Sequence, residues 1–191
     1  MLSILLNRKD AKKKIKIDYR FNASFRNVSE LPKVFLKSIE WKTIVTYRYY
    51  QSNTNSIWKK YYLRKLKKIE MKTGIRFEGN INIGDGLIIG HWGDIIINGN
   101  AKFGNGLFIT NGVNIGRDIR GKRKGTPTIG NNVCIRSNST VVGNIVIGDD
   151  VLIAPNTFVN FDVPSHSIVI GNPATIHHKE NATEGHLGKI Q

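Results

Sequence analysis

The sequence has 191 residues, of which 40% are hydrophobic and 23% charged, and its formal net charge is +15. These proportions are typical of a soluble globular protein. No apolar run approaches the roughly 18–20 residues of a membrane-spanning helix, and the N-terminal segment lacks the cleavage site of a secretion signal. A single cysteine, Cys134, excludes an internal disulfide and favours a cytoplasmic location.

The positive charge is concentrated in the first part of the chain. Residues 1–73 contain 19 Lys+Arg and 5 Asp+Glu, a net of +14, whereas residues 74–191 contain 10 and 9, a net of +1. Such a basic region fits nucleic acid, anionic lipid or a polyanionic substrate, and it equally fits a solvated basic surface.

Two helices are predicted in this basic region. Residues 56–73 carry apolar residues at helical spacing with lysines opposite, Asn55 or Ser56 can cap the start, and Gly74 suits a left-handed stop. An earlier, more hydrophobic helix is expected over residues 30–50. Residues 51–56 link the two helices, and residues 1–28 give no clear pattern.

From residue 74 onward, aliphatic residues return every six positions. The repeated positions are Ile83, Ile89, Ile97, Phe103, Ile109, Ile115, Ile129, Ile135, Val141, Ile147, Ile153 and Val159. The chain can be written in rows that each begin at one of these residues. In the last six rows the fifth position is also small or β-branched: Val133, Ser139, Ile145, Val151, Thr157 and Val163. A period of six with two inward positions predicts a coil of short parallel strands, with Gly and Asn at tight corners.

The six-residue rhythm is broken twice. The step from Ile89 to Ile97 is eight residues and contains His91 and Trp92. The step from Ile115 to Ile129 is fourteen residues and contains a basic loop at 117–128. His91 is the third residue of its row, so its side chain is expected to point outward, and a disturbed coil suits a side chain that must be re-aimed.

This pattern resembles the left-handed parallel β-helix of the hexapeptide-repeat acyltransferases, and more closely the serine acetyltransferases. The eight-residue coil with its histidine, the projecting loop and the ending DVPSHSIVIGNPATI at 162–176 carry the resemblance. The short colanic-acid and capsule O-acetyltransferases are similar too. The expected fold is mainly β, with a basic helical region at 1–73, a left-handed β-helix at 74–178 and a tail at 179–191.

The resemblance implies a homotrimer that uses acetyl-CoA as co-substrate. No metal is expected, because the other histidines lack ligand-type spacing with acidic or sulfur partners. His91 takes the position of the catalytic base, in a cleft between subunits. Acetyl-CoA is expected in the groove between coils of neighbouring subunits, at Ser137, Ala154 and Pro155. Trp92 stacks on a sugar acceptor, forms a wall of the acetyl pocket or packs at the subunit interface.

The chain departs from the family pattern around this site. Serine acetyltransferases have an aspartate directly before the histidine and a second histidine after the loop, and these positions are Gly90 and Thr126 here. Their acidic partner for the base falls on Arg76, which leaves Glu78 or Asp94 to orient His91.

The groups that hold the CoA phosphates in related sugar acetyltransferases are also replaced. They fall on Phe161 and Thr175 here, so Arg117 with its loop neighbours, or Lys179, is expected to bind the phosphates instead. A solvated basic turn is an equal interpretation of that loop.

These departures favour acetyl transfer to a hydroxyl of a sugar, surface polysaccharide or polysaccharide precursor. The alternative is a serine O-acetyltransferase of cysteine biosynthesis. A non-catalytic basic scaffold is the third interpretation, and no motif indicates a nucleic-acid partner. We expect a cytoplasmic protein whose basic region contacts the anionic inner face of the membrane.

Overall fold

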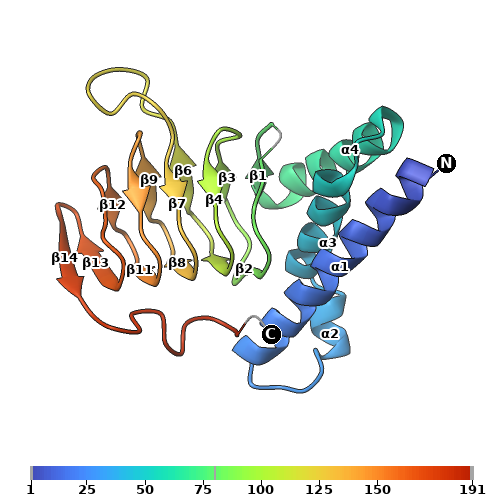
Figure 1. Cartoon of the computed structure of the whole chain (residues 1–191), viewed down its shortest axis with the longest axis horizontal. Coiled ribbons are helices and arrows are strands. Elements are labelled where there is room, and N and C mark those ends of the chain that lie inside the picture. Colours follow the sequence, from blue (N-terminus) through green and yellow to red (C-terminus); the bar gives the residue numbers. More distant parts are fainter. Residues whose placement is uncertain (1, 80, 190–191) are drawn as a thin grey trace.

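The computed structural model describes residues 2–79 and 81–189, and it places four helices at one end of a solenoid of short strands (Figure 1). The helices are α1 (Leu2–Phe25), α2 (Lys33–Leu36), α3 (Ile39–Ser52) and α4 (Ser56–Thr73). The strands are β1 (Arg76–Phe77), β2 (Leu87–Ile89), β3 (Ile96–Ile97), β4 (Lys102–Phe103), β5 (Leu107–Ile109), β6 (Asn114–Gly116), β7 (Thr128–Ile129), β8 (Val133–Ile135), β9 (Thr140–Val142), β10 (Val146–Ile147), β11 (Val151–Ile153), β12 (Phe158–Val159), β13 (Ser167–Gly171) and β14 (Ala174–His178).

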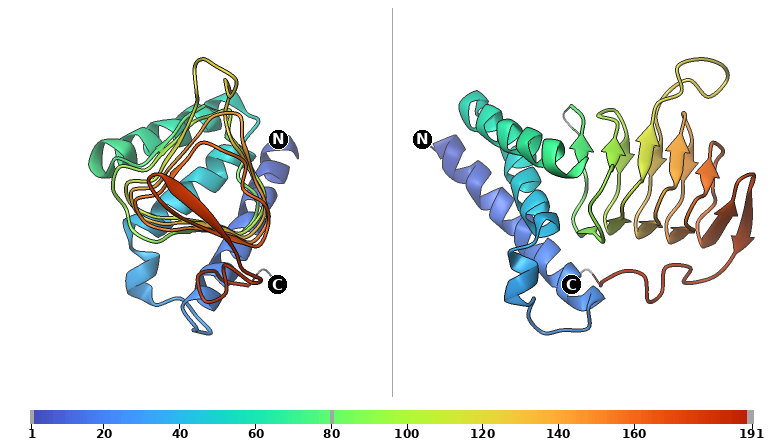
Figure 2. Two further views of the ribbon diagram at one scale, coloured as in Figure 1. Left: turned by 90° about the vertical axis from the view of Figure 1, so that its left-hand side faces the viewer. Right: turned by 180° about the vertical axis from the view of Figure 1, so that it is seen from behind.

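The strands form three sheets that are visited in turn, so that three short strands make one coil. The sheet orders are β1-β3-β6-β9-β12, β10-β7-β4 and β14-β13-β11-β8-β5-β2. All described pairings between these strands are parallel except the β13–β14 hairpin, which follows the last coil. Viewed along the axis, the stacked coils outline a triangle (Figure 2).

The six-residue period predicts the interior of this triangle correctly. Eleven of the twelve first-position residues are at most 1% exposed, and Phe103 is half-buried. The fifth-position residues Val133, Ser139, Ile145, Val151, Thr157 and Val163 are at most 2% exposed. Both inward positions of each row therefore fill one continuous core, as expected for a β-helix.

The helical region agrees with the sequence only in part. Helix α4 is confirmed: the Asn55 side chain accepts hydrogen bonds from the N–H groups of Ile57 and Trp58, and Gly74 has a φ of 73°. The single helix expected over residues 30–50 is wrong, because Ser38 adopts an extended backbone and caps a new helix by accepting from the N–H of Trp41. The long helix α1 was not anticipated.

The helices close the first coil of the solenoid by bonding to its backbone. Asp18 of α1 accepts from the N–H groups of Gly86 and Leu87, at 3.1 and 2.9 Å. Arg48 of α3 donates to the carbonyls of Ile83 and Gly84, at 2.8 and 2.7 Å. The first coil has no preceding strand to pair with, so these side chains satisfy backbone groups that would otherwise be buried without partners.

Asp18 and Arg48 also form a buried ion pair with each other. Two bonds of 2.7 and 2.9 Å join them, and both side chains are fully buried. Burial acts to lower the pKa of Arg48, but the Asp18 carboxylate outweighs burial and raises it. Arg48 therefore stays charged, and its bonds with Asp18 fix α1 and α3 to each other and to the first coil.

The C-terminal tail covers the outer face of the sheet that runs from β2 to β13. After β14 the chain returns along this sheet to α1, as Figure 1 shows. Leu187 packs on an outer apolar cluster formed by Phe21, Ile88, Phe108, Cys134 and Leu152. Burial in this cluster raises the pKa of the Cys134 thiol to about 12. This apolar face of the solenoid is thus covered by the chain itself.

Candidate functional site

His91 lies at the corner between β2 and β3, where the coil contains two extra residues. Six residues separate these strands, whereas four residues separate β5 from β6 at the same corner of the next coil. Gly93 and Asp94 take positive φ values of 127° and 44°, which widens the turn. The His91 side chain is exposed, so the prediction that it points outward is confirmed.

The widened corner continues along one edge of the solenoid. The N–H of Gly112 donates to Gly93 at 2.8 Å, and the N–H of Asn138 donates to Asn111 at 3.0 Å. The N–H of Asn156 then donates to Ser137 at 2.9 Å. These bonds stack the four corners, so His91 shares an edge with the residues predicted to contact acetyl-CoA: Ser137, Ala154 and Pro155.

Asn111 belongs to this edge and was missed in the sequence. Its side-chain oxygen accepts from the hydroxyls of Ser137 and Thr110, both at 3.1 Å. Like His91, Ser137 and Pro155, it is the third residue of its row. A comparison of third positions between rows would have found it.

The two acidic residues expected to orient His91 contact other groups. Asp94 lies against the end of α4, where its N–H donates to the carbonyl of Thr73 at 3.2 Å. Glu78 lies 3.8 Å from Arg76 and accepts from the Asn98 amide at 3.3 Å. Among residues 2–79 and 81–189, no hydrogen bond joins His91 to either carboxylate, so its partner within this chain stays unassigned.

Gly90 shows why the usual aspartate is missing before the histidine. A Cβ atom placed on Gly90 would lie 2.6 Å from Cζ of Phe108. The Phe108 ring cannot easily move, because it packs edge-on against Phe25 with a centroid distance of 5.4 Å and lies under the Arg136 guanidinium. The outer apolar cluster therefore disfavours a side chain at position 90, because the Phe108 ring would have to shift to admit a Cβ atom.

The residues predicted to hold the CoA phosphates lie at other corners. Arg117 is exposed at the start of the loop that projects from the solenoid after β6, and an Asp118–Gly125 bridge closes the base of this loop (Figure 1). Lys179 begins the tail, where its N–H donates to the carbonyl of His166 at 2.8 Å. Within one chain, neither basic residue shares the edge of His91. Trp92 is 52% exposed beside His91.

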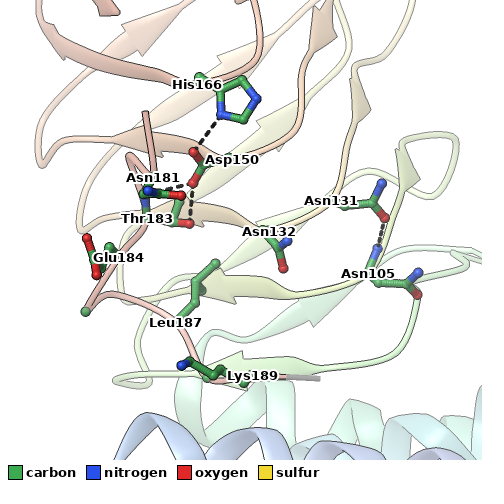
Figure 3. A pocket seen from close by; sticks show the side chains of 12 residues that line it. Asn105, Asn131, Asn132, Asp150, His166, Asn181, Thr183, Glu184, Leu187 and Lys189 are labelled. Atoms are coloured by element: carbon green, nitrogen blue, oxygen red, sulfur yellow. Dashed lines mark hydrogen bonds and ion pairs between the residues drawn. The ribbon is translucent and has the colours of Figure 1, made fainter. Parts of the chain in front are cut away.

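A polar pocket of about 860 Å³ lies at a different corner of the triangle (Figure 3). It is lined by corner residues such as Asn105 and Asn131 and by the returning tail, including Thr183 and Lys189. None of its lining residues belongs to the edge of His91. The pocket therefore separates the tail from the solenoid and is not part of the candidate active site.

Asp150 holds the tail at this pocket. It accepts hydrogen bonds from the N–H and hydroxyl of Thr183 and from Nδ1 of His166, at 2.6 to 3.0 Å (Figure 3). It also accepts from the N–H of Ala182 at 2.9 Å. Partial burial acts to raise the pKa of Asp150, but these bonds outweigh burial and lower it. Asp150 thus acts as an ionised anchor for the tail.

The sequence matches known transferases over the solenoid. The bacterial transferase hexapeptide family (six repeats) matches residues 126–160. The chain is 38% identical over 105 residues to serine acetyltransferase 2 of Arabidopsis thaliana. The matched stretch covers 54% of this chain and 32% of the plant protein. It spans between 29% and 61% of the length of eight serine acetyltransferases that it resembles.

The fold matches solved serine acetyltransferases over most of the chain. The Neisseria gonorrhoeae enzyme in complex with serine gives a TM-score of 0.74 at 23% identity, over 90% of this chain and 71% of that one. A serine acetyltransferase in complex with CoA gives 0.75 at 23% identity, over 88% and 70%. The left-handed β-helix with a helical N-terminal region and the serine acetyltransferase-like resemblance are thereby confirmed.

Proposed function

We propose, from this serine acetyltransferase-like β-helix, that the chain is an acetyl-CoA-dependent O-acetyltransferase and that L-serine is its acceptor. The exposed His91 at the widened corner carries the proposal, because it supplies a base on the same edge as Ser137 and Pro155. The relatives named above are serine acetyltransferases, and they favour the serine alternative over the polysaccharide acceptor predicted from the sequence.

The proposed reaction needs a base that also acts as an acid. His91 accepts the proton of the acceptor hydroxyl while the hydroxyl oxygen attacks the thioester carbonyl of acetyl-CoA. The carbon–sulfur bond then breaks, and His91 returns the proton to the departing thiol. A histidine suits both steps because its imidazole changes charge near neutral pH.

The widened corner also offers donors for the oxyanion that forms during this attack. Within the described chain, the N–H groups of Trp92 and Gly93 donate to no protein acceptor. Backbone N–H groups that face a developing oxyanion stabilise it without reorganisation. We assign Trp92 and Gly93 this role in the proposed reaction.

The site is proposed to be completed by a neighbouring copy in a homotrimer. Arg117 and Lys179 lie away from the edge of His91 within one chain, so a second chain must bring either of them to the CoA phosphates. Arg and Lys both suit phosphate groups, and Arg can bind them through two parallel bonds.

A sugar hydroxyl is the second candidate acceptor, and Gly90 is the observation that favours it. The packing of Phe108 disfavours a carboxylate at position 90, so this chain lacks an acidic group that the family places beside the histidine. An amino acid brings an ammonium and a carboxylate, which bind poorly when either is left unpaired. A sugar brings neutral hydroxyls.

Thiol release from acetyl-CoA distinguishes the two acceptors. Purified protein is assayed with L-serine and, in parallel, with nucleotide-sugar and oligosaccharide acceptors at equal concentration. We expect saturable release with L-serine, at a KM in the usual range of about 1 μM–1 mM. Release that depends on a sugar and not on serine would promote the second candidate, and no release with either set would refute acetyl transfer.

A further inference from the structure

Helix α4 presents an outer surface that is both basic and apolar. Of its 18 residues, seven are basic and one is acidic. The series 57, 60, 64, 68, 71 and the series 57, 61, 64, 68, 71 both run at steps of three and four, which places these six residues on one side of the helix. We call Ile57, Lys60, Tyr61, Arg64, Lys68 and Met71 the outer α4 surface.

The apolar members of this surface are unusually exposed. Ile57 is 74%, Tyr61 42% and Met71 79% exposed, whereas Leu66 on the opposite side of the helix is 8% exposed and belongs to the core. Isolated exposed apolar residues need no explanation, but three on one helical stripe are typical of a contact surface.

The basic members have no acidic partner in the part of the chain that the structure describes. Glu70, the acidic residue of α4, is bonded to Arg76 at 2.6 Å. Among the described residues, Lys60, Arg64 and Lys68 form no ion pair. The positive charge of the outer α4 surface is therefore free to act on an external anion.

Helix α1 adds further positive charge beside the start of α4. Arg8 of α1 lines a cleft of about 290 Å³ together with Trp58 and Tyr62 of α4. Lys9, Lys12 and Lys13 on the same part of α1 are exposed. Both helices extend beyond the solenoid (Figure 2), so a broad flat partner can reach them without contacting the strands.

We propose that the outer α4 surface docks the protein on an anionic lipid bilayer. Lysine and arginine are attracted to acidic headgroups, and each contributes substantially to surface binding, while Ile57, Tyr61 and Met71 insert at the headgroup boundary. A nucleic acid would leave the exposed Ile57 and Met71 without a role. A second copy of the chain would bring like charges together. Within the described residues no helix combines the length and hydropathy needed to cross a bilayer, so the contact is peripheral.

Vesicle sedimentation tests this assignment on the full chain. The wild type is mixed with vesicles of phosphatidylcholine alone, or of phosphatidylcholine with 30% phosphatidylglycerol, at roughly 0.1 M salt, where charges still interact over about 10 Å. We compare K60Q/R64Q/K68Q, which removes three charges from the outer α4 surface, with K33Q/K37Q/K42Q, which removes three exposed charges from the α2–α3 region. A third variant, I57S/Y61S, removes apolar contacts without changing charge.

The expected result is binding to the phosphatidylglycerol vesicles alone. The partition coefficient of the protein onto these vesicles should fall on the order of 100-fold in K60Q/R64Q/K68Q. It should also fall clearly in I57S/Y61S, and it should fall much less in the control K33Q/K37Q/K42Q. Far-UV circular dichroism checks that each variant is folded.

Three outcomes would overturn the assignment. The first is no binding, or equal binding to both vesicle types. The second is an equal loss in both charge variants, which would indicate diffuse attraction. The third is a change of oligomeric mass in I57S/Y61S with vesicle binding unchanged, which would assign this surface to contacts between copies.

Discussion

The imidazole of His91 is the side chain on which the proposed chemistry depends. It is exposed at a corner that departs from the regular coil, and no ion pair joins it to another residue of the described chain. Its removal should therefore affect the reaction and leave the structure intact.

We predict that His91→Ala lowers the rate of acetyl transfer by roughly 10²–10⁴, the usual contribution of a general base. The matched control is His178→Ala, which removes another exposed histidine from β14. Thiol release measures the rate, and the unfolding midpoint in urea should be unchanged in both variants. Near-wild-type turnover of His91→Ala would refute its assignment as the base.

Gly90 gives a second prediction, on stability. Gly90→Ala places a Cβ atom against the pinned ring of Phe108, and such overpacking typically costs about 1–3 kcal/mol of the free energy of unfolding. Urea denaturation measures this loss. Gly90→Ala should cost less in a Phe108→Leu background than in the wild type, because the smaller side chain leaves room for the Cβ atom. If the double variant instead loses the full sum of the two single losses, the residues do not clash.

At the level of secondary-structure elements, the helices are connected to the solenoid through buried polar groups. Helix α1 buries Asp18 and Asn22, both fully, and Asn22 donates to the carbonyl of Leu87 at 2.9 Å. This explains why α1 was not predicted: a search for a helical stripe of apolar residues passes over a helix whose buried face is partly polar.

We predict that Asp18→Ala costs about 3–5 kcal/mol of the free energy of unfolding, because it leaves Arg48 as a buried charge without its partner. Lys14→Ala on the same helix is the control. It breaks a partly exposed pair with Asp85 at 3.4 Å and should cost less than about 1 kcal/mol. Equal losses in urea denaturation would contradict this account of the cap.

The attachment of the tail should depend on pH. Because the folded-state pKa of Asp150 is lowered, the ionised anchor contributes fully above the unfolded value of about 3.9 and is lost as the pH falls through the lowered value. We therefore expect the attachment of the tail to begin to weaken below about pH 4 and the tail to detach once the pH falls through the lowered pKa of Asp150. A dye on Lys189→Cys reports this as a fall in fluorescence anisotropy, with the native Cys134 buried.

Two variants in that labelled background test the anchor. Asp150→Ala should give low anisotropy at every pH, whereas Glu184→Gln removes an exposed carboxylate from the same tail and should leave the titration unchanged. Circular dichroism at each pH separates detachment from global unfolding. A titration that Asp150→Ala does not alter would show that other groups hold the tail.

The solenoid shows how far a repeat can be predicted from sequence alone. The six-residue period located the inward positions correctly and identified the widened corner with His91, because each inward position must be apolar or small. The tail on the outer face was not predicted. Its signal was present, since Ile88, Phe108, Cys134 and Leu152 repeat at the sixth position of their rows. The identity of the covering segment could not follow from that repeat, because long-range packing decides it.

For the whole molecule, one face of the triangle remains for contact between copies. Two faces meet at the corner of His91, that of β2 to β13 and that of β3, β6, β9 and β12. The first is covered by α1 and the tail, so the second is the open face beside His91. Ile96 and Phe158 lie on it, with exposures of 37% and 36%.

We predict that Ile96→Asp/Phe158→Asp dissociates the proposed trimer and abolishes the proposed acetyl transfer while the fold is kept, because buried carboxylates without partners are unfavourable. Val146→Asp, at an exposed apolar position on the β10-β7-β4 face, should leave the assembly intact. Light scattering after size exclusion gives the mass. An active, stable monomer of the wild type would contradict both the trimer and the shared site.

The bonds from Asp18, Asn22 and Arg48 to the first coil have a consequence for how the molecule behaves in a crowded solution. An open end of a parallel coil is a row of unpaired N–H and C=O groups, and another coil of the same kind can continue it indefinitely. The helices occupy one end of the solenoid, and the antiparallel β13–β14 hairpin follows its last coil. The helices thereby protect one end against head-to-tail growth into fibres, and at the other end the hairpin extends one of the three sheets. The basic helices are thus a condition of remaining a discrete particle.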